Sequence, residues 1–131
     1  MNNKGFTLIE LIATIALLAV ISIISFVSIN SVVEKNKISN CETLVSNIEI
    51  AAKEYISDNR YNIEDKNLRI NIGILINGNY LSGDVIDPFT DKRIGTSYIY
   101  VDVYLNDDYT VNSVDVKNAS NVTINCDSGR L

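Results

Sequence analysis

The feature that most constrains this chain is a run of 23 residues without an ionisable side chain, from Leu11 to Val33. Glu10 precedes the run, and Glu34 is the next charged residue. At about 1.5 Å per residue, a helix of this length spans roughly 34 Å, enough for a hydrocarbon core of about 30 Å. No small-residue cleavage site of the secretory type follows it. The run predicts a membrane-spanning helix, and an ordinary signal anchor is the simplest alternative.

Beyond Val33 the apolar residues change to helical spacing. They recur every three or four positions, while charged residues fill the other faces, which is typical of an amphipathic helix packed on a core. Neither Pro nor Gly occurs between Phe6 and Arg60, so we expect one helix of about 50 residues. The residues of the apolar stripe are Ile38, Cys41, Val45, Ile48, Ala52 and Tyr55 or Ile56.

The remaining chain predicts a small sheet. Residues 68–81 are ambiguous between a strand and a helix, and we favour a short helix ending near Gly78. Residues 83–95 read as a loop, and residues 97–105 and 109–117 as a hairpin around a turn at 106–108. Alternation at 122–126 predicts a third strand. We therefore predict an α+β fold: a long N-terminal α-helix, half membrane-spanning and half amphipathic, packed against a small antiparallel β-sheet of about three strands.

Composition excludes several classes of function. The net charge is −5 and no histidine is present, so a nucleic-acid surface and a histidine-based catalytic or zinc site are not expected. The glycines form neither a P-loop nor a GxGxxG motif. We expect no catalytic residues, no cofactor and no metal.

The residues before the apolar run carry the most specific signal. Residues 4–12, beginning Lys4-Gly5-Phe6 and continuing Thr-Leu-Ile-Glu, match the processing site of a type IV prepilin residue by residue. The chain resembles the type IV pilin and pseudopilin family, with the class III signal of such pilins. The resemblance implies cleavage by a membrane prepilin peptidase between Gly5 and Phe6, and N-methylation of Phe6. Residues 1–5 would be the leader, 6–33 the transmembrane and filament-core helix, and 34–131 the pilin head.

Glu10 is unusual because a carboxylate in a membrane helix costs on the order of 3 kcal/mol at the bilayer centre, and less near its edge. The resemblance implies that its partner is the amine of Phe6 in the neighbouring subunit. Snorkelling of Glu10 to the headgroups is the alternative. Lys4 would hold the N-terminus on the cytoplasmic side by the positive-inside rule.

A second resemblance concerns the loop that contains Asp87-Pro88-Phe89. Together with Tyr80-Leu81 it is similar to the αβ-loop of Gram-positive pilins and of major type II secretion pseudopilins, although an ordinary Asp-Pro turn is the favoured explanation. Many type IVa pilins have a proline that kinks the membrane helix, and this chain has none there.

The two cysteines are expected on the same core, where they form either a disulfide or two buried thiols. Cys41 lies on the helical stripe, and Cys126 shares the apolar alternation of residues 122–126. A head outside the cytoplasm would allow a bridge. Other candidates have ordinary explanations: calcium-binding carboxylates are less favoured than solvated turns at Asp87, Asp91, Asp107 and Asp108, and two sequons begin at Asn118 and Asn121.

The sequence therefore predicts a structural subunit that self-assembles with other pilin subunits into a helical filament. As the resemblance implies, its partners would be the prepilin peptidase, an assembly platform with a cytoplasmic ATPase, and the plasma membrane before assembly, with an extracellular pilus as the destination. A pseudopilin of a type II secretion or DNA-uptake machine, and a signal-anchored extracellular binding domain, are the two alternatives.

Overall fold

The computed structural model describes residues 4–131, apart from the side chain of Val27. Met1, Asn2 and Asn3 of the predicted leader lie outside this range. The chain divides into two compact units, one that ends at Asn36 and one that comprises Lys37–Leu131. We describe each by itself.

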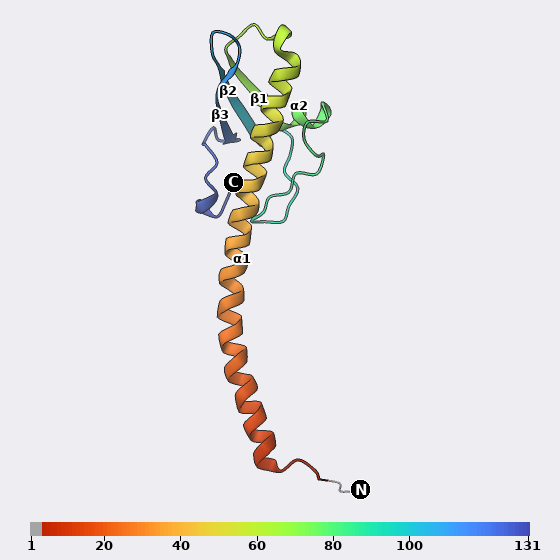
Figure 1. Ribbon diagram of the computed structural model, residues 1–131, viewed down its shortest axis with the longest axis vertical. Coiled ribbons are helices and arrows are strands. Elements are labelled where there is room, and N and C mark those ends of the chain that lie inside the picture. The colour runs from red at the N-terminus through yellow and green to blue at the C-terminus, as the bar shows by residue number, and fades with distance from the viewer. Residues whose placement is uncertain (1–3) are drawn as a thin grey trace. The chain divides into compact units, whose positions relative to one another are not determined.

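Helix α1 (Leu8–Asn59) is the longest element, with 52 residues (Figure 1). This confirms the prediction of one helix of about 50 residues. A single 3₁₀ turn, Arg60–Asn62, follows it before the chain turns into the sheet.

The sheet contains three antiparallel strands in the order β1-β2-β3 (Figure 1). Strand β2 (Ile99–Leu105) is central and pairs with both β1 (Asn67–Asn71) and β3 (Val111–Asn118). The β2–β3 hairpin was predicted. Its second strand begins two residues later than expected because Tyr109 has φ 60°, a left-handed conformation that belongs to the turn.

Residues 68–81 were compatible with either a strand or a helix, and the structure contains a strand followed by a helix. Our prediction of a helix was therefore wrong for the first part of this segment. Residues Asn67–Asn71 form β1, and Ile72–Asn77 form helix α2. Asn71 marks the change: its backbone is extended, and its side chain accepts a hydrogen bond from the backbone N–H of Ile74 at 3.0 Å. Such an N-cap satisfies a donor that the first helical turn leaves free.

The predicted strand at 122–126 is also wrong. Thr123 forms only an isolated bridge with Lys117, and Cys126 begins a 3₁₀ turn. Asn118 bonds through its side chain to the backbone N–H groups of Ser120 and Val122. Side-chain bonds of this local kind replace ladder bonds and end the strand.

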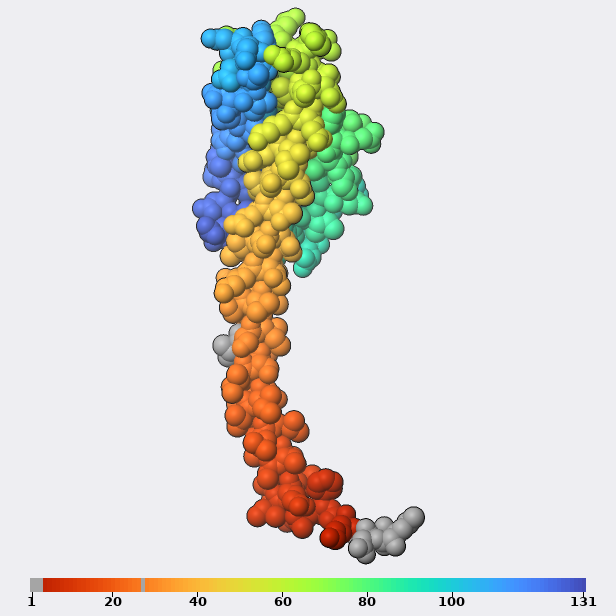
Figure 2. Space-filling view, viewed as in Figure 1, coloured from red at the N-terminus to blue at the C-terminus, as the bar shows by residue number. Residues whose placement is uncertain are grey.

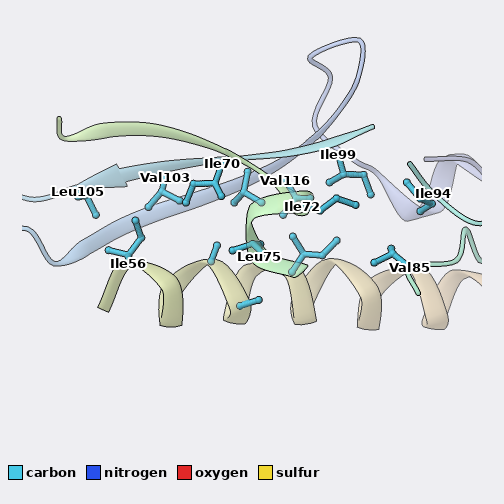
Figure 3. Close-up of a cluster of buried hydrophobic side chains, with 14 residues drawn as sticks. Ile56, Ile70, Ile72, Leu75, Val85, Ile94, Ile99, Val103, Leu105 and Val116 are labelled. Carbon is cyan, nitrogen blue, oxygen red and sulfur yellow. The ribbon is translucent and has the colours of Figure 1, made fainter. Parts of the chain in front are cut away.

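The core of the second unit lies between the sheet and α1. In Figure 3 the side chains of the strands and those of α1, such as Ile56, point toward one another, and Leu75 of α2 lies among them. Burying one such side chain contributes about 1.5 to 3 kcal/mol. The helix residues with an exposed fraction of 2% or less are Cys41, Ile48, Ala51, Ala52 and Ile56. All but Ala51 belong to the predicted stripe.

Candidate functional site

The start of α1 is fixed by two reciprocal hydrogen bonds. The backbone N–H of Thr7 donates to Oε2 of Glu10 at 2.9 Å, and the backbone N–H of Glu10 lies 3.4 Å from Oγ1 of Thr7. Thr7 also accepts the first helical bond, from the N–H of Leu11 to its carbonyl at 3.2 Å. This is a capping box, in which a Thr at the N-cap and a Glu three residues later each satisfy a backbone donor of the other.

Residues 4–7 lie outside any helix or strand. Nothing lies within 4 Å of the position that a side chain on Gly5 would occupy, and Phe6 is 84% exposed. Lys4, Gly5, Phe6, Thr7 and Glu10 line one open hollow of about 480 Å³. The predicted cleavage, methylation and assembly residues are therefore neighbours, and the backbone on both sides of Gly5 is accessible.

The helix beyond Glu10 is apolar and uncovered. Every described side chain from Leu8 to Val33 is exposed, and Figure 2 shows this part of α1 in red and orange. Large apolar side chains point in all directions, with exposed fractions such as 63% for Leu17 and 70% for Phe26. A helix that is hydrophobic all round needs lipid or other helices around it.

Four hydroxyl groups in the apolar part of this helix donate to the helix's own carbonyls. Each donates to a carbonyl three or four residues earlier, at distances between 2.7 and 3.2 Å. A satisfied hydroxyl is tolerated in lipid, where a free one is costly. The four donors are Thr14, Ser22, Ser25 and Ser28.

In the second unit, a disulfide joins Cys41 of α1 to Cys126, with 5.7 Å between the Cα atoms. Cys41 is fully buried. The bridge attaches the C-terminal segment to the helix, 85 residues earlier in the chain.

One charged side chain, Asp102, is buried in the sheet. Asp102 of β2 is 8% exposed and accepts two bonds from Arg69 of β1, at 2.6 and 2.7 Å, while Nζ of Lys117 of β3 lies 2.9 Å from it. The hydrogen bonds from Arg69, opposed by desolvation and assisted by Lys117, lower the pKa of Asp102 to about 2. This cluster ties the three strands together, and nothing in it indicates catalysis.

The other candidate carboxylates are dispersed, and three of them have partners within the chain. Asp87 bonds to the backbone N–H of Phe89 and the hydroxyl of Thr90, Asp107 pairs with Lys66, and Asp108 bonds to Thr110. No group of three or more metal-ligating side chains occurs within residues 4–131.

The comparison with family models matches residues 1–26 to the prokaryotic N-terminal methylation motif. The chain carries the class III signal of type IV pilins and pseudopilins. Comparisons with curated proteins and with solved structures gave no match. Within the described residues, α1 is the one helix that is long and apolar enough to cross a membrane. The class III signal and this helix together indicate a membrane-anchored precursor.

Two structural features of this chain were not predicted from its sequence. Thr7 and Glu10 have the Thr-x-x-Glu spacing of a capping box. We had interpreted both residues only as part of the prepilin processing motif, so the capping box was not predicted. The cluster of Arg69, Asp102 and Lys117 could not be recognised because Arg69 lies on the strand that we took for a helix.

Proposed function

We propose that the chain is a structural subunit of a type IV pilus, made as a membrane-held precursor, cut after Gly5, methylated on Phe6 and assembled into an extracellular filament. The observation that carries this proposal is the uncovered apolar helix directly after the class III signal. In the membrane, lipid covers this helix. In a filament, the corresponding helices of neighbouring subunits do so, and the head residues remain outside.

Glu10 supplies the specificity of assembly in this proposal. Cleavage leaves a positive amine on Phe6, four residues before Glu10, and no further charge follows before Glu34. Pairing that amine with Glu10 of a neighbouring subunit neutralises two charges as the apolar helices come together. One carboxylate oxygen holds the N–H of Thr7, and the other remains able to accept the amine.

Mass spectrometry of the N-terminus of the native protein tests the processing step. We expect a chain that begins at methylated Phe6. A chain that retains residues 1–5 would instead support a signal-anchored extracellular domain whose helix is only a tether.

Replacing Glu10 by Gln tests the assembly step. Gln keeps the side-chain oxygen that accepts the N–H of Thr7, so the start of the helix is preserved while the charge is lost. We expect normal processing of E10Q and loss of filaments from the fraction sheared off the cells. Filaments at the level of the unaltered protein would contradict the ion pair.

The same shearing experiment separates a pilus from a pseudopilus. A pilus subunit is recovered in long surface filaments of the unaltered cells. A pseudopilin of a secretion or DNA-uptake machine would remain with the cell envelope.

A further inference from the structure

The capping box lies two residues after the bond that the proposed peptidase cuts. Residues 4–7 are outside the helix, and α1 begins at Leu8. Toward the edge of a bilayer, a helix start whose first backbone N–H groups have no partner gains by extending toward the cytoplasmic face, because the additional turn moves those groups to where water can bond them. Gly5 resists such extension only by its low helix propensity. The side chains of Thr7 and Glu10 remove the reason to extend, since they satisfy the backbone N–H groups of Glu10 and Thr7.

We propose that Thr7 and Glu10 are positioning residues for the cleavage between Gly5 and Phe6, because their capping box keeps this bond out of the helix. The inference rests on the leader cleavage proposed above. In that step water adds to the carbonyl carbon of Gly5 and the C–N bond to Phe6 breaks. The products are a carboxylate on Gly5 and a protonated amine on Phe6.

The bond between Gly5 and Phe6 must lie outside the helix so that the peptidase can reach it. Inside a helix the carbonyl of Gly5 would accept a bond from the N–H four residues later, and the turns on either side would shield its carbon. In the structure, nothing beyond its two chain neighbours lies within 4 Å of the position that a side chain on Gly5 would occupy, and Phe6 is 84% exposed. A protease reaches such a segment without first unwinding a helical turn.

The test measures cleavage of the full chain in membranes that contain a bacterial prepilin peptidase, normalised to the membrane-inserted pool. Thr7→Val removes the capping oxygen at nearly constant volume. We expect cleavage up to about fivefold slower, because losing one N-cap shifts the population between two helix starts by about that factor. Thr7→Ser and Thr7→Asn keep a capping oxygen, so both should be cut within twofold of the unaltered rate. Glu10→Gln should also be cut at that rate.

Thr14→Val is the matched control. It makes the same change two turns into the same helix, where the hydroxyl bonds only to the carbonyl of Leu11. We expect no change in its cleavage. In micelles, the carbon chemical shifts of Gly5 and Phe6 should move toward helical values in Thr7→Val and not in Thr14→Val.

The outcomes separate this inference from the proposed function. If the unaltered chain is not cut, both fail. If it is cut and Thr7→Val is cut equally fast, only the positioning role fails. If Thr7→Asn is as slow as Thr7→Val, the peptidase reads the threonine directly and the capping explanation is overturned.

Discussion

Removing the disulfide between Cys41 and Cys126 should strongly destabilise the unit Lys37–Leu131. The bridge joins residues 85 positions apart. In the chain-entropy model, closing a loop of that length in the unfolded state is worth about 4 to 5 kcal/mol. A domain of this size is stabilised by about 5 to 15 kcal/mol in total. We therefore expect replacement of both cysteines by alanine to remove about a quarter or more of its stability.

The tyrosines allow this measurement on the full chain in detergent. The protein has seven tyrosines and no tryptophan, and every tyrosine lies between positions 55 and 109. Tyrosine fluorescence in a urea titration thus reports on the second unit, while the apolar helix stays in the micelle. The midpoint should fall in the variant, and reduction of the unaltered protein should produce a similar fall.

Thiol counting gives the control. Unreduced, denatured protein should show no free thiols, and reduced protein should show two. Ile50→Ala, on an exposed position of the same helix, should change stability little because Ile50 is 50% exposed. Two free thiols before reduction, or a double-alanine variant within about 1 kcal/mol of the unaltered protein, would refute the reasoning.

Three further predictions concern the same unit and the same titration. Asp102→Asn should lower the free energy of unfolding by about 2 kcal/mol at pH 7, because it leaves the Arg69 guanidinium without its carboxylate. Since folding lowers the pKa of Asp102 to about 2, its stabilisation is complete above about pH 5 and is lost as the pH falls through 2, and the variant should lack this part of the pH dependence. Leu75→Ala, at a fully buried position, should cost about 2 to 5 kcal/mol, whereas Ile74→Ala, 40% exposed, should cost under about 1; equal losses would contradict the assigned core. Asn71→Ala should cost about 1 kcal/mol through loss of the α2 cap, and Asn71→Asp should restore it.

The sequence was sufficient where a pattern was long. The uncharged run and the apolar stripe extend over many turns, so one helix of about 50 residues was predicted, and α1 has 52. The class III signal was also predicted, because the motif is defined by the order of consecutive residues and does not depend on tertiary contacts.

Short patterns failed because tertiary pairing decided them. Residues 67–71 could form helix or strand, and their pairing with β2 selected the strand. Residues 122–126 alternate like a strand, but asparagine side chains compete for the backbone bonds on both sides. The partners of Asp102 come from two other strands, so no spacing along the chain could reveal them.

The self-bonded hydroxyls of α1 have a consequence for how its neighbours are chosen. Serine and threonine in membrane helices often hydrogen-bond across an interface and so fix the register between helices. Here Thr14, Ser22, Ser25 and Ser28 each bond to their own helix. Along residues 14–28, a neighbouring helix would therefore meet hydroxyl groups whose donors are already used, and sliding past them would change mainly the packing. Register would then be set toward the two ends of the uncharged run, by the carboxylate of Glu10 and by the side chains of Asn30 and Ser31.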